Sequence, residues 1–151
     1  MKKIMLITIL LVGTLVVFSQ DLVIEEGKYY LDGELFTGIH TQNYETGSVN
    51  AEYNITNGLL NGYSILYYED GQKMEQQSFS IGIKDGTWLK WNEKGIKVAE
   101  ANYKMGNKEG YWYIWNDKGV MLYKMYYENG KKSGKWIMWD NDGNITMERE
   151  Y

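Results

Sequence analysis

The sequence predicts an all-β fold: an elongated antiparallel meander of β-hairpins, built on a repeat of 24 residues. Glycine spacing carries this prediction, because three series of glycines each recur with that step, and 14 of the 17 glycines belong to them. The series are Gly38, Gly62, Gly86, Gly110, Gly134; Gly47, Gly71, Gly95, Gly119, Gly143; and Gly58, Gly82, Gly106, Gly130. A fixed period of this length indicates a repeat protein, in which each unit buries apolar surface against its neighbours. The chain has no proline, which suits continuous hydrogen-bonded sheet.

Residues 1–19 are predicted to be a secretory signal peptide. A start with two lysines precedes the 15-residue apolar run Ile4–Phe18, and the small Ser19 suits cleavage before Gln20. The alternative is an uncleaved anchor, although a full membrane span needs about 20 apolar residues. Export of a chain without cysteine favours the periplasm of a Gram-negative bacterium or the extracellular space, with no stable membrane insertion after cleavage.

Residues 20–37 are predicted to form an N-terminal β cap. Leu22–Ile24 and Lys28–Leu31 are short β-type runs, and the Asp-Gly pair at 32–33 is a hairpin signal. An atypical sequence is expected in the first unit, because that unit must protect an open sheet edge.

Residues 38–151 are predicted to be five repeats, the last of them shortened. In each unit a first strand begins at the opening glycine, as in Gly86–Trp91, and a tight turn follows that ends on a glycine such as Gly119. Glycine suits that place because a positive φ has no steric cost for it. The alternation in Met121–Tyr127 has the period of a strand, and an Asn-Gly turn at 129–130 leads to the next unit. Two strands and two turns fill the repeat, which predicts a meander.

Tryptophan recurs two and five residues after the opening glycine in the last three units. The six residues are Trp88, Trp91, Trp112, Trp115, Trp136 and Trp139. Residues three apart on a strand point to opposite faces, so the two tryptophans of a unit are expected on opposite faces. A column of aromatic residues ends the second strands: Phe79, Tyr103, Tyr127 and Tyr151.

Two interpretations of these aromatic columns remain open. Both columns could pack along the sheet, where aromatic cross-strand pairs stabilise neighbouring strands. Alternatively, one column could stay exposed as a strip that binds a protein or a glycan, because Trp and Tyr are favoured at binding hot spots. The contact residues predicted for such a strip are the six tryptophans with Tyr111 and Tyr113.

Charged residues recur at both turns of the repeat. Acidic residues follow the first strand (Glu45, Glu69, Glu93, Asp117), and lysines follow the second (Lys84, Lys108, Lys132). A meander places these turns on opposite rims, which predicts one acidic rim and one basic rim. One carboxylate about every 10 Å is too sparse for Ca²⁺, which takes six to eight oxygens. We therefore expect neither a metal site nor a cofactor.

The sequence favours no enzyme class. His40 is the only histidine and there is no cysteine, so neither a catalytic triad nor a thiolate or histidine metal site is supported. A glycosidase that uses carboxylates alone is the remaining enzymatic alternative and ranks last. The net charge of −4 disfavours a nucleic-acid partner.

The pattern Y-x-x-G-x-x-x-G-x-W-x-x-W-x-x-x-G occurs at Tyr103–Gly119 and Tyr127–Gly143. It resembles the bacterial MORN-type repeat variant, which occurs in proteins described as YwqK-family antitoxins. The resemblance covers residues 38–151 and implies a β-hairpin array that binds or scaffolds other macromolecules.

The leading hypothesis is an exported, non-enzymatic β-repeat protein that binds or scaffolds another protein through an aromatic-rich face of its sheet. One alternative is an antitoxin or immunity-type inhibitor of a toxin, which the resemblance implies. Another is a glycan-binding module at the cell surface, which the aromatic strip would also serve.

Overall fold

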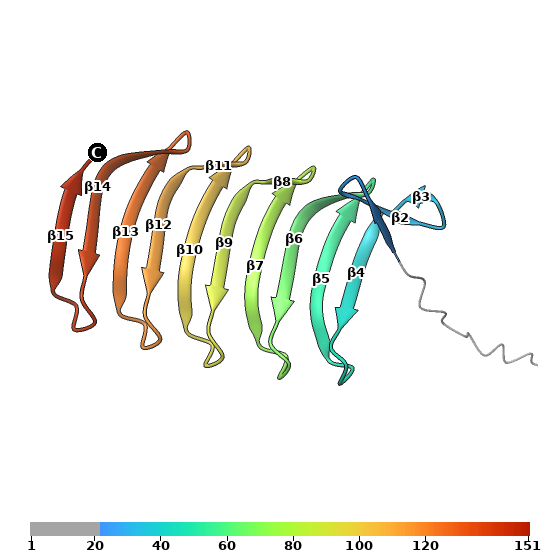
Figure 1. Cartoon of the computed structure of the whole chain (residues 1–151), viewed down its shortest axis with the longest axis horizontal. Coiled ribbons are helices and arrows are strands. Elements are labelled where there is room, and N and C mark those ends of the chain that lie inside the picture. Colours follow the sequence, from blue (N-terminus) through green and yellow to red (C-terminus); the bar gives the residue numbers. More distant parts are fainter. Residues whose placement is uncertain (1–21) are drawn as a thin grey trace, which may run out of the picture.

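The computed structural model describes residues 22–151, which form fifteen strands in two antiparallel sheets (Figure 1). The prediction of an all-β hairpin meander is confirmed. Within residues 22–151 no helix is long and apolar enough to cross a membrane. The predicted signal peptide, residues 1–19, lies outside the described residues.

The larger sheet follows the order of the sequence, so each long strand pairs with the long strands before and after it. Its long strands are β4 (Gly38–Asn43), β5 (Val49–Thr56), β6 (Leu59–Tyr67), β7 (Lys73–Ser80), β9 (Gly86–Trp91), β10 (Lys97–Lys104), β12 (Gly110–Trp115), β13 (Met121–Glu128), β14 (Lys131–Trp139) and β15 (Ile145–Glu150). Two short strands, β8 (Ile83–Lys84) and β11 (Asn107–Lys108), pair with β7 and β10 and lead into β9 and β12. Each predicted repeat is therefore one strand pair, and the repeats stand side by side (Figure 1).

The turns between repeats have the conformation that a tight hairpin requires. Ile81 and Gly82 have φ angles of 49° and 76°, and two positive φ values in a row suit the right-handed twist of the flanking strands. At the other rim, Gly119 has a φ of 81°, which confirms the predicted turn. Adjacent repeats are also tied by backbone bonds at these turns, as where Gly82 N donates to Leu60 O at 2.7 Å.

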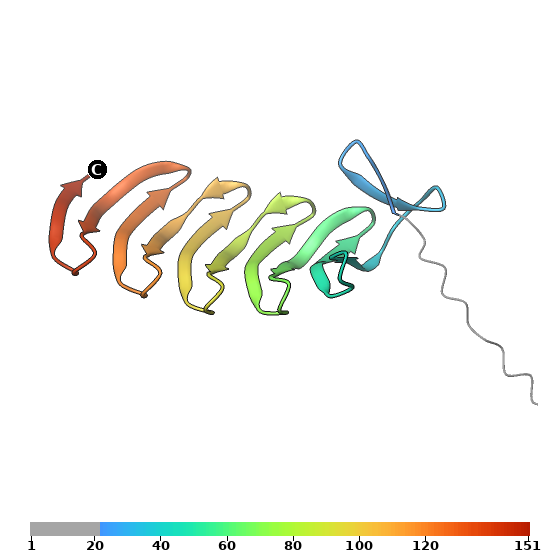
Figure 2. The ribbon, with the colours of Figure 1, turned by 60° about the horizontal axis from the view of Figure 1, so that its bottom comes forward.

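The residues before the first repeat make a separate three-stranded sheet. Its strands are β1 (Val23–Glu25), β2 (Lys28–Leu31) and β3 (Glu34–Leu35). Backbone bonds hold this sheet on the turn between β5 and β6: Tyr29 N donates to Gly58 O, and Gly58 N donates to Phe36 O, both at 2.8 Å. The small sheet thus lies at the N-terminal end of the array (Figures 1 and 2).

The array is a single layer of curved strands, and no second layer of described elements covers it (Figure 2). Few apolar side chains are buried, namely Ala51, Ile55, Tyr127 and Trp136. Cross-strand register places all four on the same face of the sheet. Most of the packing is therefore between neighbouring side chains on one face, rather than between two layers.

Candidate functional site

Seven aromatic rings form a continuous row on that face, which we name the aromatic ladder. In order along the array they are Phe79, Trp88, Tyr103, Trp112, Tyr127, Trp136 and Tyr151. Consecutive ring centroids lie 4.8–5.5 Å apart with the planes tilted by 52–62°. Tilted pairs at this separation are the favourable arrangement for aromatic side chains. We call the face that carries the ladder the ladder face.

Strand register explains why the ladder alternates between two series of residues. In the second, third and fourth units the opening glycine pairs with the aromatic residue of the next strand, as Gly110 pairs with Tyr127. Glycine has no side chain at that point, and the tryptophan two residues later packs against the tyrosine ring. Each indole also donates a hydrogen bond across the sheet, as from Trp112 Nε1 to Asn102 O at 2.9 Å. The ladder tryptophans are thus held by both packing and hydrogen bonding.

The three lysines predicted to form a basic rim lie over the ladder instead. Lys84 Nζ is 4.2 Å from the Trp88 ring centroid and 5.1 Å from that of Tyr103. Lys108 and Lys132 lie over the next two Trp/Tyr pairs in the same way, at 4.3–4.9 Å. The prediction of a separate basic rim is wrong, because a lysine stem is long enough to reach the rings, whose faces attract a cation.

The ladder changes character toward the N-terminus. His40 stacks on Tyr53 with centroids 6.2 Å apart, and Tyr29 from the small sheet lies 6.4 Å from the same ring. Ser64 stands at the tryptophan position of the second repeat and is completely buried, and its hydroxyl makes no hydrogen bond to the described residues. The aromatic ladder is therefore confined to the later repeats.

A second aromatic group lies on the opposite face, which we name the patch face. Tyr111, Tyr113 and Trp115 follow one another along β12, with centroids 5.8 and 5.6 Å apart and planes within 29° of parallel. Tyr126 of β13 meets Tyr111 edge-on at 5.0 Å. We name these four residues the aromatic patch. The expectation that the two tryptophans of a unit face opposite ways is confirmed by Trp112 in the ladder and Trp115 in the patch.

Two segments of the chain match the MORN repeat variant. The family model matches residues 60–80 and residues 119–133. The first segment covers most of the β6–β7 hairpin, and the second covers β13, the end of the turn before it, the turn after it and the start of β14. The sequence resemblance to the MORN-type repeat variant is confirmed at these two segments. A search of curated proteins gives no match.

The predicted contact residues divide between the two faces of the array. Trp88, Trp112 and Trp136 belong to the ladder, and Trp136 is only 8% exposed. By the alternation of side chains along the strands, Trp91, Trp115 and Trp139 lie on the patch face with Tyr111 and Tyr113, and the three tryptophans are half-buried. Tyr111 is 44% exposed, so the more accessible of the predicted contacts lie on the patch face.

The prediction missed two residues of the patch face, Tyr126 and Lys124. Together with Tyr111, Lys135 and Ile137 they line an open hollow of about 300 Å³, in which Gly134 leaves room. Lys124 Nζ is 4.9 Å from the Tyr111 ring centroid. The alternation in β13 could have placed both residues opposite Tyr127, but their proximity to Tyr111 depends on cross-strand register.

Ion pairs surround the aromatic patch. Lys97 Nζ is 2.7 Å from Glu100 and also 4.5 Å from the Trp115 ring centroid. Lys135 Nζ is 2.8 Å from Glu148. Burial, and to a lesser degree the Glu100 carboxylate, raises the pKa of Tyr113. The patch therefore has apolar rings in its centre and paired charges around them.

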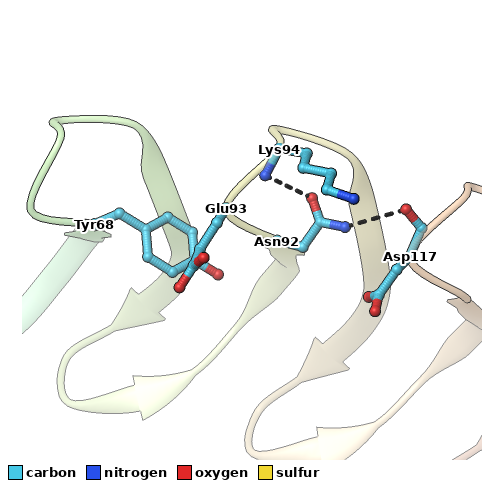
Figure 3. Close-up of a pocket in the computed structure, with 5 residues that line it drawn as sticks. All are labelled: Tyr68, Asn92, Glu93, Lys94 and Asp117. Atoms are coloured by element: carbon cyan, nitrogen blue, oxygen red, sulfur yellow. Dashed lines mark hydrogen bonds between the residues drawn. The ribbon is translucent and has the colours of Figure 1, made fainter.

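The acidic rim has a hollow of about 330 Å³ between two turns, lined by Tyr68, Asn92, Glu93, Lys94 and Asp117 (Figure 3). Its polar groups hold the turns: Asn92 Oδ1 accepts from Lys94 N at 3.0 Å, and Tyr68 Oη donates to Trp91 O at 2.9 Å. Burial, followed by the nearby carboxylates of Glu93 and Asp117, raises the pKa of Tyr68. The polar side chains of this hollow are explained by turn formation.

Asp140 occupies the corresponding position in the last turn. Its Oδ1 accepts hydrogen bonds from Asn144 N at 2.8 Å and Asp142 N at 3.0 Å. Hydrogen bonds from Asn144 are the main reason that the pKa of Asp140 is lowered. Within residues 22–151, no group of three His, Cys, Asp or Glu side chains is placed to hold a metal ion.

Proposed function

We propose that this chain is an exported, non-enzymatic repeat protein that binds another protein through the aromatic patch. The observation that carries the proposal is the difference between the two faces. Ladder indoles donate hydrogen bonds and have aromatic neighbours on both sides, whereas Tyr111 at the edge of the patch remains 44% exposed. The match to the MORN repeat variant also suggests a non-enzymatic repeat module.

The composition of the patch face fits a protein interface. Tyr and Trp supply most of the binding energy in many interfaces, where a polar rim surrounds an apolar centre. Here the rings of Tyr111, Tyr113 and Trp115 supply the centre, and the Lys97–Glu100 ion pair lies at its border. The rings are already stacked on one another, so little side-chain freedom is lost when a partner binds.

Site-specific photo-cross-linking tests this proposal. A photoreactive phenylalanine analogue replaces Tyr111 in one protein and Tyr63 in the control, because Tyr63 has the same place in the repeat two units earlier and is 54% exposed. We expect a discrete cross-linked protein from position 111 and little from position 63. Excess unlabelled wild-type protein should suppress the product, whereas excess of a Tyr113→Ala/Trp115→Ala protein should not. Equal cross-linking at both positions would refute the assignment of the patch.

The absence of catalysis is part of the proposal and is supported by the surroundings of the ionisable groups. Tyr68 donates to a backbone carbonyl, and the Asp140 carboxylate accepts from turn N–H groups. Perturbed pKa values point to active sites only where the groups converge in a cleft. Incubation with glycoside and ester substrates should give no turnover above the buffer rate, and turnover that survives repurification would overturn this part.

Export is proposed from the N-terminal sequence. A charged start, an apolar run and a small residue before Gln20 are typical of a cleaved signal peptide. N-terminal sequencing of the protein recovered from periplasm or culture medium should begin at Gln20 or within a residue or two of it. Recovery of the intact N-terminus from the cytoplasm would contradict the proposal.

Glycan binding is the second candidate function, and the nearly parallel rings of Tyr111, Tyr113 and Trp115 favour it. Flat aromatic surfaces can stack against sugar rings, so a glycan array with wild-type and Tyr111→Ala proteins distinguishes this function from protein binding. An antitoxin role is supported only by the resemblance to YwqK-family proteins. Co-expression with the product of the neighbouring gene tests it, because an antitoxin should relieve the toxicity of that product.

A further inference from the structure

The three lysines above the aromatic ladder form a row of positioned cations. Lys84, Lys108 and Lys132 each hold Nζ within 4.2–5.1 Å of two ladder ring centroids. None of these three ammonium groups has a hydrogen bond or ion pair with another residue of the described chain. Each ammonium has three N–H donors. The row therefore presents ammonium N–H donors in fixed positions, and no acceptor of the described chain uses them.

The ladder face is basic although the chain as a whole is acidic, with a net charge of −4. Its strands and lysine row carry five basic side chains and one acidic one: Lys84, Lys90, Lys108, Lys132, Arg149 and Glu75. On the patch face, six lysines are nearly balanced by five glutamates: Lys73, Lys97, Lys104, Lys124, Lys131, Lys135, Glu52, Glu100, Glu128, Glu148 and Glu150. Charge complementarity thus directs an acidic partner to the ladder face.

The acidic residues next to the lysine row are engaged by the backbone. Asp85 follows Lys84, and its Oδ2 accepts from Met105 N at 2.9 Å. Glu109 follows Lys108, and its Oε2 accepts from Asn129 N at 2.8 Å. Because these carboxylates cap the turns of the next repeat, they form no ion pair with the lysines. The positive charge of the row is therefore not neutralised by direct pairing.

The spacing of the row indicates the conformation of the partner. Equivalent residues of adjacent repeats are separated by two strands, which is about 9.5 Å. In a polyproline II helix three residues rise by about 9.3 Å, so side chains three apart would meet successive lysines. Polyproline II segments also bind to surfaces lined with aromatic rings. An ordinary β-strand places residues of the same side about 6.7 Å apart, so its side chains would not match the spacing of the lysines.

We propose that the ladder face of repeats two to five binds an acidic peptide segment in the polyproline II conformation, with an acidic residue at every third position. The segment lies along the array, its carboxylates on Lys84, Lys108 and Lys132 and its remaining residues on the ladder rings. Leu60 stands at the lysine position of the first repeat, so the site ends there. This site is separate from the aromatic patch and does not depend on the function proposed for it.

Fluorescence anisotropy with the full chain and a labelled peptide of Glu-Pro-Pro triplets tests the proposal. We expect saturable binding that weakens at least about tenfold when all three row lysines become glutamine, a loss of about 1.4 kcal/mol. Binding should also weaken when the salt concentration rises from about 0.05 to 0.5 M. The matched control carries Lys73→Gln, Lys94→Gln and Lys118→Gln, which remove the same charge away from the ladder face, and it should bind within about twofold of wild type.

Further variants separate the proposal from a loss of folding. The Lys84→Arg/Lys108→Arg/Lys132→Arg protein keeps both the charge and the contact with the rings, so it should bind the peptide like wild type. A Tyr111→Ala/Tyr113→Ala protein should also bind normally, because those residues lie on the other face. If the arginine protein has a wild-type circular-dichroism spectrum and does not bind, or if the control loses binding as much as the glutamine protein, the proposal is wrong.

Two other probes test the identity of the partner. A peptide of the same composition with its glutamates in one block should bind at least about tenfold more weakly, and equal binding would refute the match of spacing. A sulfated heparin oligosaccharide represents the polyanionic glycans. Binding of this glycan without binding of the triplet peptide would overturn the assignment to a peptide.

Discussion

Replacing Trp112 with alanine should lower the free energy of unfolding by about 3 kcal/mol. Trp112 has ladder rings 5.1 and 5.3 Å away on its two sides, and such pairs contribute about 0.5–1.5 kcal/mol each. Its Nε1 hydrogen bond adds about 1 kcal/mol, and the Lys108 cation adds about 0.5–1 kcal/mol. The terms sum to about 4 kcal/mol, and we expect less because Trp112 is only half-buried and the contributions overlap.

Trp115→Ala is the matched control, because it removes the same side chain from the other face of the same strand. Trp115 stacks on one ring, Tyr113 at 5.6 Å, and Lys97 lies 4.5 Å above it. With one aromatic pair and one cation, its loss should lower stability by about 1 kcal/mol. Urea unfolding followed by far-UV circular dichroism measures both proteins without dependence on indole fluorescence. If Trp115→Ala destabilises as much as Trp112→Ala, the ladder is not the main source of packing energy.

Three more substitutions test other parts of the structure. Ile81→Asn should stabilise the protein by about 1 kcal/mol, because Ile81 has a φ of 49° and Asn57 holds the corresponding position at the same φ; a urea midpoint at or below that of wild type would contradict this. Ser64→Ala should raise the melting temperature, since it removes a buried hydroxyl without a partner among the described residues, worth about 1 kcal/mol; a lower melting temperature would mean that the hydroxyl has a partner. Burial, and then Glu75, raises the pKa of Tyr103 above 10.0. The neutral Tyr103 side chain contributes stability that is fully present below the pKa of tyrosine in the unfolded chain. This contribution is lost as the pH rises toward the pKa of Tyr103 in the folded protein. Tyr103→Phe should therefore make the loss of stability above about pH 10 less steep, and an unchanged slope would exclude Tyr103 as a source.

Both the repeat and its strands could be predicted because their signals are local. The positive φ of Gly119 depends on a few neighbouring residues, and the opposite orientation of Trp112 and Trp115 follows from the alternation of side chains along one strand. A period of 24 residues then leaves room for only two strands and two turns. The glycine and aromatic positions in the sequence therefore suffice to define a meander with one tryptophan series on each face.

The different roles of the two tryptophan series were decided by cross-strand packing. Trp112 and Trp115 look equivalent in the sequence. In the sheet, Tyr127 pairs with an opening glycine, and its ring therefore lies between Trp112 and Trp136, whereas no such ring of the described chain separates Trp115 from the tryptophan of the next repeat. Likewise, Lys108 was predicted at a rim, and it lies over the ladder because the strands curve and its long side chain reaches the rings. Distances between strands depend on register and curvature, which arise only when all the repeats pack together. The sequence period therefore defines the sheet, whereas the packed array determines which rings are enclosed and which remain accessible.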